Sequence, residues 1–460
     1  MTQLDEAITR YHRILESAPY RDLQWVKNLQ EEMEARQLSA GGRLLCPFLR
    51  PNFVTQKQYD NLVKTGEALI SAVDRMLHLA LASPQLLTRM QLLPAEKMLA
   101  AIDPGYEMSE VSAQLDLQIQ NGSLHVMQYN SDALTGAAWS EGLSDLFYDC
   151  PPVKEFRRRY TLTRVGGKKP FLSALMKAYK MFAASTPGAK PKPQIAILEF
   201  RDPTGRSEYE IYRDYFRHEG YQTEILTPDQ LEYRNGVLRV SSGPQPGMEI
   251  NLIYRRISAH EFLLRFTLNH PLVQAYRDRA VCIVNSFRAE LSHKKAMFAL
   301  LTDETLTTKF PINERKAIKE HLPWTRVVKA GKTTGRDGVI EDLPEYIRQN
   351  RETLVLRPND DYGDLNTYVG YEHDEGSWNR AVREAQMSPY VVQERVKPVR
   401  TVFPLMTYGH LEFKEMQVDV QPQAFLGKVA GCSSYVSQSG SGNYSPASGF
   451  TPTFIIDPKN

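Results

Sequence analysis

The sequence predicts a mixed α/β (α+β) fold, and three observations support this prediction. Residues 184–290 alternate short apolar runs with amphipathic segments, which is typical of an α/β layer. Residues 114–130 alternate polar and apolar side chains on both sides of Asn121-Gly122, which predicts a tight antiparallel hairpin. Over residues 59–82, apolar side chains recur at three- and four-residue steps, which predicts a long helix with one buried face.

The first 95 residues form a predicted helical subdomain. Its longest helix, over residues 59–82, is expected to stop at Ser83-Pro84, because proline cannot continue a helix. Few chemically reactive groups are concentrated in this part of the chain. We therefore expect residues 1–95 to pack against and orient the rest of the chain, and we assign them no catalytic role.

Three further segments are expected after residue 95. Residues 96–183 carry the hairpin and connecting helices, and the proline-rich stretch ASTPGAKPKP then marks a boundary. Residues 184–290 form the α/β domain, with strands in QIAILEF, INLIYRR and AVCIVNSF. Residues 291–460 contain the strand candidates TLVLRP, YVVQERV and TPTFII, with the amphipathic helix SWNRAVREAQM between the first two.

Composition excludes several classes of partner. The chain has 460 residues, with 56 Lys and Arg against 54 Asp and Glu, so its net charge of +2 gives no general attraction to nucleic acid or anionic membranes. No stretch approaches the roughly 20 apolar residues that cross a bilayer. The N-terminal residues lack the apolar core of a signal peptide, and the cysteines are widely spaced, so we expect a reduced, cytoplasmic protein. The four cysteines are Cys46, Cys150, Cys282 and Cys432.

The predicted hairpin carries a candidate magnesium site. Asp116 lies on one strand, and Gln128 and Asn130 lie on the other, two residues apart and therefore on the same face. Mg²⁺ prefers oxygen ligands in octahedral geometry and often shares them with nucleotide phosphates. A surface hairpin whose polar side chains face water would show the same pattern.

A second candidate site is VLRPNDDYGDLNTYVG, residues 355–370. A strand delivers Arg357 into an acidic turn, and the planar guanidinium is well suited to bind phosphate through two parallel hydrogen bonds. A structural ion pair from Arg357 to Asp360 or Asp361 remains an equally valid interpretation.

A third candidate lies at the end of the apolar strand in PYVVQERV, residues 389–396. Gln393, Glu394 and Val396 could offer backbone donors and acceptors to the edge of an adenine. The alternative is a strand that simply leaves the core.

The fourth candidate is SFRAELSHKKAMFALLTDE, residues 286–304, which predicts one helix. Lys294 and Lys295 are flanked by apolar residues, so one of the two is expected near the interior, where it could bind a phosphate. The alternative is that its ammonium group extends to solvent along the surface.

Other common active-site motifs are absent from the sequence. It contains no HExxH, no GxxxxGK[ST] phosphate loop and no GxGxxG after a strand. Residues 440–442, GSG, lack the GxSxG pattern of a hydrolase nucleophile.

Taken together and in this order, the four motifs resemble the circularly permuted ATP-grasp family, of the glutathionylspermidine synthetase type. The resemblance covers roughly residues 100–460 and extends to the stretches LTPDQLEYRNGVL, HLPWTRVV and GNYSPASGF. It implies a permuted ATP-grasp fold that holds ATP and Mg²⁺ between two lobes. It also implies a ligase that converts a small-molecule carboxylate into an acyl phosphate and joins it to an amine.

The resemblance also implies roles for individual residues. Lys295, or less closely Lys294, matches one phosphate-binding lysine of the family, and Arg357 stands where the other lysine is expected. The implied metal ligands are Asp116, Gln128 and Asn130, and the implied nucleotide-binding residues are Lys295, Arg357, Gly363, Gln393, Glu394 and Val396.

Several positions depart from the family pattern. Gln114 stands where the family has an arginine, and Gln128 stands where it has a glutamate, so the site has lost charge that would bind phosphate and Mg²⁺. The glycine-rich phosphate cover of the family retains only Gly363, and Asp364 adds a negative charge there. A carboxylate about 4 Å from a phosphate costs about 4 kcal/mol at an effective dielectric near 20.

Two functional hypotheses arise from these matches and departures. In the first, the protein is a carboxylate-amine ligase with a weakened ATP site. In the second, it is a catalytically silent member of the fold that binds a small molecule or supports an active partner subunit.

Overall fold

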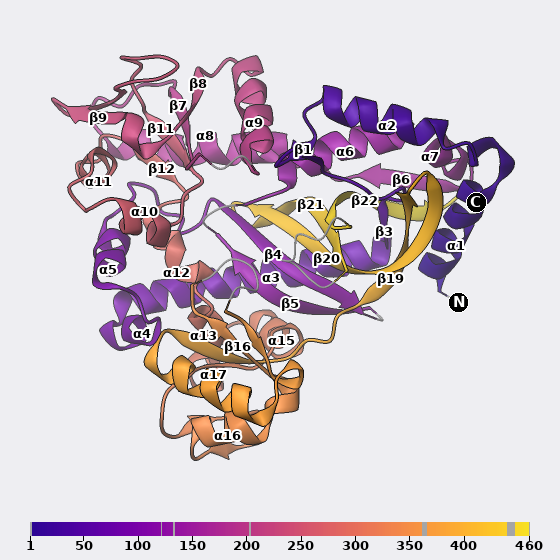
Figure 1. The fold of residues 1–460 in the computed structure, drawn as a ribbon. Coiled ribbons are helices and arrows are strands. Elements are labelled where there is room, and N and C mark those ends of the chain that lie inside the picture. The colour runs from indigo at the N-terminus through magenta and orange to yellow at the C-terminus, as the bar shows by residue number, and fades with distance from the viewer. Residues whose placement is uncertain are drawn as a thin grey trace.

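The structure is a computed structural model that describes residues 2–120, 122–131, 134–201, 204–360, 366–438 and 447–459. Figure 1 shows three layers, with an α/β layer at the top, a large central sheet in the middle and a small lobe of sheet and helices below. This mixed α/β architecture agrees with the fold class expected from the sequence.

The central sheet is the largest unit of the described chain. Its strands lie in the order β3-β22-β21-β20-β4-β5, with β19 paired to β20 and β6 paired to β22. The pairs are antiparallel except for β3 and β22, which run parallel. The strands are β3 (Asn52–Thr55), β4 (Ser112–Gln120), β5 (Ser123–Asn130), β6 (Tyr160–Arg164), β19 (Arg400–Thr407), β20 (His410–Phe425), β21 (Lys428–Ser437) and β22 (Gly449–Pro458).

Strands β4 and β5 confirm the predicted hairpin. Gln114 pairs with Asn130, and Asp116 pairs with Gln128, so the polar side chains gather on one face of the sheet. Asn121 of the turn lies outside the described residues, and Gly122 has a positive φ of 85°.

Helix α3 (Gln56–Ala82) confirms the long helix expected over residues 59–82. Thr55 and Gln58 form a capping box at its N-terminus. Figure 1 shows α3 running across the face of the central sheet near β4 and β5. The other helices that accompany the central sheet are α1 (Gln3–Glu16), α2 (Gln24–Ala35), α4 (Pro84–Arg89), α5 (Pro94–Ala101), α6 (Ala137–Asp149) and α7 (Pro151–Phe156).

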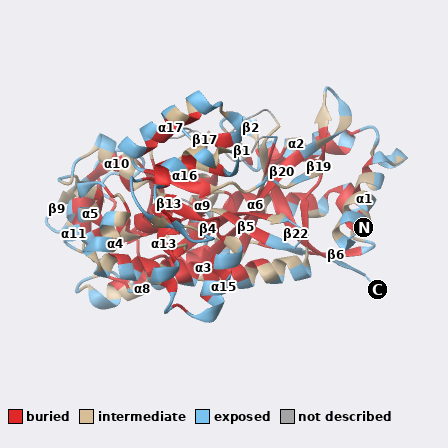
Figure 2. Ribbon diagram, turned by 90° about the horizontal axis from the view of Figure 1, so that it is seen from below, coloured by how far each residue is buried: buried red, intermediate tan, exposed pale blue. Residues whose placement is uncertain are grey.

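The first 95 residues are mainly helical, but they are built into the central layer. They contribute strand β3, which pairs with β22 from the last part of the chain. They also contain the short strands β1 (Ser39–Ala40) and β2 (Arg43–Leu44). Apolar side chains of α1, α2 and α3 belong to the same hydrophobic core as those of β4, β5 and β22. Figure 2 shows the buried residues concentrated through the middle of the molecule, with exposed residues around its outline.

The α/β layer contains a parallel sheet in the order β12-β11-β7-β8. Helix α8 (Lys168–Ser185) precedes the proline-rich stretch, yet it packs in the same core as β7 and β11. The remaining strands and helices are β7 (Ile195–Leu198), β8 (Thr223–Leu226), β9 (Leu231–Arg234), β10 (Val237–Val240), β11 (Leu252–Arg255), β12 (Cys282–Val284), α9 (Arg206–His218), α10 (Ala259–Arg265) and α11 (Pro271–Arg277).

The small lobe has its own antiparallel sheet in the order β13-β18-β16-β17. Its core surrounds Trp378, which is fully buried and donates its indole N–H to the carbonyl of Ile347. The elements are β13 (Thr325–Val327), β14 (Thr333–Thr334), β15 (Val339–Ile340), β16 (Leu354–Pro358), β17 (Tyr368–Val369), β18 (Tyr390–Glu394), α16 (Leu343–Gln349) and α17 (Glu375–Met387).

The prediction of a single helix over residues 286–304 is wrong, because the helical backbone is interrupted at Lys294 and Lys295. Two short helices, α12 (Glu290–His293) and α13 (Ala296–Leu301), flank the break. At the break, the backbone N–H of Lys295 donates to the carbonyl of Asn359 in the small lobe, 3.0 Å away. A contact between layers therefore replaces the helical hydrogen bonding that local periodicity predicts. Helices α14 (Glu304–Thr307) and α15 (Ile312–His321) come next along the chain.

Asn285 joins the α/β layer to the hairpin. Its side-chain oxygen accepts hydrogen bonds from the backbone N–H groups of Val111 and Ser112, at 2.8 and 3.1 Å. Its side-chain nitrogen donates to the carbonyls of Ser112 and Ser131. These contacts fix the start of β4 and the end of β5 against the end of β12. None of the described helices is both long enough and apolar enough to cross a membrane.

We predict that Asn285→Ala lowers the free energy of unfolding by about 2 to 5 kcal/mol, because two buried backbone N–H groups lose their acceptor. Urea denaturation of both proteins measures this difference. The matched control is Asn269→Ala, at an exposed position of the same layer, which should change stability little. Equal losses in the two variants would contradict the proposed linking role of Asn285.

Candidate functional site

The candidate site is centred on Asp116, whose carboxylate is buried on the polar face of the hairpin. One carboxylate oxygen accepts hydrogen bonds from the side-chain amides of Gln114 and Gln421, at 3.2 and 3.1 Å. The other accepts one from the amide of Asn130, at 3.1 Å. Asp116 and Asn130 are each only 8% exposed. A buried carboxylate must be paired or hydrogen-bonded, and here three amides from three strands meet that need.

The structure brings together all three metal ligands expected from the sequence. Gln128 donates its side-chain N–H to the side-chain oxygen of Asn130, 2.7 Å away, and Asn130 in turn donates to Asp116. Gln128 is partly exposed at the edge of this chain of hydrogen bonds. The set offers one carboxylate and two amide oxygens, and these are donor types that Mg²⁺ accepts.

The charge of Asp116 is balanced by competing effects. Burial raises the pKa of its carboxyl group, whereas the hydrogen bonds from Gln114, Asn130 and Gln421 and the positive charge of Arg357 lower it. The pKa of Asp116 is raised overall, so these hydrogen bonds and the charge of Arg357 compensate only in part for the hydration that the carboxylate loses on burial. An additional cation next to Asp116 would favour its charged form.

Arg357 reaches from the end of β16 toward the hairpin. One of its terminal nitrogens lies 3.4 Å from the backbone carbonyl of Met127 on β5, and its charge acts on Asp116. Of the two ion pairs considered for Arg357, Asp361 lies outside the described residues, and Asp360 pairs with Lys294 instead. The small lobe thus presents a guanidinium group to the face of the hairpin that holds the buried carboxylate.

Both Lys294 and Lys295 lie in the interior, although the sequence led us to expect only one there. Lys294 is 2% exposed, and its ammonium group binds Glu96, at 2.7 Å, and Asp360. Burial lowers the pKa of Lys294, but Asp360, Glu290 and Glu96 outweigh burial and raise it. Lys294 thus has two carboxylate partners, Glu96 and Asp360.

Lys295 is positioned through its backbone and that of the next residue. The residue is 7% exposed and begins α13. Its N–H binds the carbonyl of Asn359, and the N–H of Ala296 binds the side-chain oxygen of Asn359, at 3.0 and 2.8 Å. Asn359 is two residues beyond Arg357, so these hydrogen bonds attach the backbone at Lys295 to the segment of the small lobe that follows Arg357.

The predicted adenine-binding segment lies where the chain leaves the small lobe. Gln393 is 5% exposed and donates its side-chain N–H to Thr325, at 3.1 Å. Glu394 pairs with Arg336 at 2.9 Å. Val396 is half-buried in the connection that leads from β18 to β19 of the central sheet.

Two positions in the phosphate cover expected from the sequence, Gly363 and Asp364, lie outside the described residues. The effect of Asp364 on phosphate therefore stays a prediction.

No protein-family model matches the chain, and no curated protein matches it in sequence. Among solved structures, it is similar to a glutathione synthetase-like effector from Globodera pallida in its apo form, with a TM-score of 0.57 and 12% sequence identity. This match covers 94% of this chain and 96% of that chain. The chain therefore has a glutathione synthetase-like fold. A second match is a Methylobacillus flagellatus KT structure, provisionally named a gamma-glutamylcysteine synthetase, with a TM-score of 0.41 and 11% identity over 86% of each chain.

Three residues that support this site in the glutathione synthetase-like fold were missed at the sequence level. Gln421 contributes an amide to Asp116 from β20, and the alternation of Gln417, Asp419, Gln421 and Gln423 in that strand could have indicated a polar face. Asn359 and Glu96 gave no comparable signal, because their partners are distant in sequence.

The opposite side of the hairpin holds a buried carboxyl group, Glu110, which accepts a hydrogen bond from the hydroxyl of Tyr129. Burial raises the pKa of Glu110 to about 7, although the hydrogen bonds from Ser292 and Tyr129 lower it. The folded protein thus holds a proton on Glu110 that the unfolded chain, with an ordinary pKa of 4.5, releases earlier as the pH rises.

We predict that the stability contributed by protonated Glu110 is fully present below pH 4.5 and is lost as the pH rises to about 7. The loss should approach about 3 kcal/mol, because each pKa unit corresponds to about 1.4 kcal/mol. Glu110→Gln, which stays neutral, should lack this loss when urea denaturation is measured from pH 4.5 to 8. Glu107→Gln, at an exposed position, should retain the wild-type pH dependence. Parallel pH profiles for wild type and Glu110→Gln would refute this account.

Proposed function

We propose that the protein is an ATP-grasp-type carboxylate-amine ligase that acts through an acyl phosphate and has a weakened ATP site. The observation that carries this proposal is the approach of Arg357, from the small lobe, to the hairpin that buries Asp116. Lys295 is tied to the same edge of the small lobe through Asn359. Cationic groups on one lobe can bind the phosphates of a nucleotide, and acidic groups on the facing lobe can bind its metal ion, so the two lobes can hold both ligands between them.

In this proposal, Lys295 and Arg357 bind the phosphates of ATP, and Gln393, Glu394 and Val396 bind its adenine. Asp116, Gln128 and Asn130 hold Mg²⁺, which supplies positive charge to the transferring phosphoryl group. The residues fit such an ion by donor type, provided that the two amides rotate to present oxygen instead of nitrogen. The hairpin β4–β5, which carries the proposed metal ligands, belongs to residues 96–183. It precedes the nucleotide-binding region, residues 291–460, as in a circularly permuted ATP-grasp fold.

The reaction would proceed in two steps. A carboxylate oxygen of one substrate attacks the terminal phosphorus of ATP, ADP leaves, and an acyl phosphate forms. The amine of the second substrate then attacks the acyl carbon, inorganic phosphate leaves, and the nitrogen releases one proton to solvent as the amide forms. The positive charges of Lys295 and Arg357 would stabilise the negative charge that passes across the phosphoryl group.

The competing proposal is a catalytically silent protein that binds a small molecule or supports an active partner subunit. It is favoured by the hydrogen bonds at Asp116, where three side-chain amides already satisfy the carboxylate. The resemblance implies an arginine at position 114 and a glutamate at position 128, and this chain has the uncharged Gln114 and Gln128 there. Both residues are paired within the hairpin, Gln114 with Asn130 and Gln128 with Asp116.

We predict magnesium-dependent binding of a non-hydrolysable ATP analogue, measured by calorimetry with and without Mg²⁺. Lys295→Ala and Asp116→Asn should each weaken this binding at least about 10-fold, because each removes one charge that faces the nucleotide or its metal. Asp116→Asn keeps the size of the side chain. Lys319→Ala, at an exposed position of α15, is the matched control for a lost lysine and should bind normally.

Absence of binding at millimolar nucleotide would reject the ligase proposal and support the silent protein. Binding that is unchanged in both Lys295→Ala and Asp116→Asn would instead show that the nucleotide occupies another site.

We further predict that Gln128→Glu increases magnesium-dependent affinity for the ATP analogue about 10-fold, because it adds a second carboxylate to the ligand set. Gln120→Glu adds the same charge at the exposed end of β4 and should have no effect. An unchanged or lower affinity in Gln128→Glu would argue that the missing charge at this position is not what weakens the site.

A further inference from the structure

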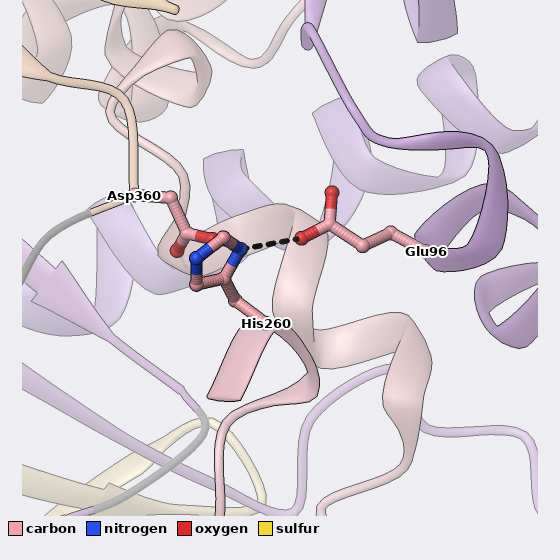
Figure 3. Close-up of side chains that lie close together, drawn as sticks. All are labelled: Glu96, His260 and Asp360. Atoms are coloured by element: carbon pink, nitrogen blue, oxygen red, sulfur yellow. Dashed lines mark ion pairs between the residues drawn. The ribbon is translucent and has the colours of Figure 1, made fainter. Parts of the chain in front are cut away.

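A second group of side chains that can bind a metal lies where the three layers meet, outside the ligand set of the hairpin. Glu96 comes from α5, His260 from α10 of the α/β layer, and Asp360 from the residue pair just after β16. Figure 3 shows these three side chains pointing toward one another from separate parts of the chain.

The distances within this cluster are close to those of a metal coordination shell. The Nδ1 atom of His260 lies 3.9 Å from a carboxylate oxygen of Glu96 and 3.7 Å from one of Asp360. All three ligand atoms lie within 4.8 Å of one another. Two ligands each about 2.1 Å from a tetrahedral zinc ion are about 3.4 Å apart, so an approach of the ligand atoms by a few tenths of an ångström to about 1.4 Å would form the shell.

A hydrogen bond orients the carboxylate of Glu96, and a histidine lies near the carboxylate of Asp360. The second oxygen of Glu96 accepts the backbone N–H of Leu93, the N-cap residue of α5, at 2.8 Å, which turns the first oxygen toward the cluster. The second oxygen of Asp360 lies 3.8 Å from the Nε2 atom of His293. The hydrogen bond behind the ligand atom of Glu96 orients it, as such contacts do around known metal ions.

The donor set favours one class of ion. An imidazole nitrogen with two carboxylate oxygens suits Zn²⁺ and similar transition metals, whereas Mg²⁺ takes oxygen ligands. Glu96 is almost fully buried, but the side chain of His260 is 41% exposed, so the cluster opens to solvent on the histidine side. An ion could enter there, and water could complete its coordination.

One cation already interacts with both carboxylates, and this is the ammonium group of Lys294. It binds the same oxygen of Glu96, at 2.7 Å, and the same oxygen of Asp360 that face His260. A metal ion and the Lys294 ammonium must therefore compete for these two oxygens, and binding of one displaces the other.

We propose that Glu96, His260 and Asp360 form a binding site for a transition-metal ion of the Zn²⁺ class, with the ammonium group of Lys294 as the competing cation. The proposal does not rest on the ligase function, since it requires neither nucleotide nor substrate. When the metal binds, the ammonium group of Lys294 loses its two carboxylate partners. Metal binding would therefore leave an additional positive charge beside Lys295, at the edge of the small lobe.

The test is calorimetric titration of Zn²⁺ into the full chain, purified without a polyhistidine tag, with Co²⁺ absorption as a second readout of tetrahedral geometry. We expect one ion per chain for this site. His260→Ala should weaken binding at least 10-fold because it removes the nitrogen ligand. Lys294→Met should strengthen binding at least 10-fold because it removes the competing ammonium group.

Lys294→Met leaves the buried carboxylate of Glu96 and the partly buried carboxylate of Asp360 close together without the ammonium group, and this should lower the melting temperature. Zn²⁺ should then raise the melting temperature of Lys294→Met more than that of the wild type, because the ion replaces the missing charge. If Lys294→Met does not fold, His260→Ala still decides the question, because its side chain lies at the exposed rim.

The matched control is His218→Ala, which removes an exposed histidine that contacts a single carboxylate, Glu219, at 3.4 Å. It should leave Zn²⁺ binding unchanged. The proposal is overturned if the wild type binds no Zn²⁺, if His260→Ala binds as well as the wild type, or if a folded Lys294→Met gains no affinity. In each case the cluster would be a lysine ion pair only.

Discussion

The buried carboxylate of Asp116 is the constraint on which the central layer of this protein depends. A charge inside a sheet is costly unless polar groups surround it, and the groups that do so here come from β4, β5 and β20. Gln421 on β20 is 305 residues from Asp116 in sequence, so the carboxylate favours one position and one register of β20 beside the hairpin. The hydrogen bonds of Asn285 then fix the same hairpin to the α/β layer, and Arg357 approaches it from the small lobe.

Much of this architecture could be predicted from the sequence, because the signals are local. Alternation around Asn121-Gly122 predicted the hairpin, and three- and four-residue periodicity predicted α3. The apolar runs predicted β7, β11 and β12 in the α/β layer. Spacing on the hairpin also predicted that Gln128 and Asn130 share a face, since side chains two residues apart in a strand point the same way. Spacing did not predict that Asp116 pairs with Gln128, because this pairing depends on a register shift between Asp116 and Leu117.

The parts that could not be predicted depend on contacts between distant segments. Periodicity over residues 286–304 favours one helix, but Asn359, more than 50 residues later, supplies a backbone acceptor that replaces a helical bond at Lys295. Likewise, nothing near Glu96 in sequence indicates that its carboxylate meets Lys294 and Asp360. Strand β3 joins the central sheet beside β22, from the opposite end of the chain, which no local pattern reveals.

The contacts of Asn359 have a mechanical consequence. Its side chain donates to the carbonyl of Met90 at 2.8 Å and accepts the N–H of Ala296, while the adjacent Asp360 pairs with Lys294. One edge of the small lobe is thus attached to the rest of the molecule beside the proposed phosphate ligands. Any motion that preserves these contacts must turn the small lobe about an axis through that edge. Residues near the axis move least, so Lys295 would stay nearly fixed, while α16 and α17 would sweep the widest arc.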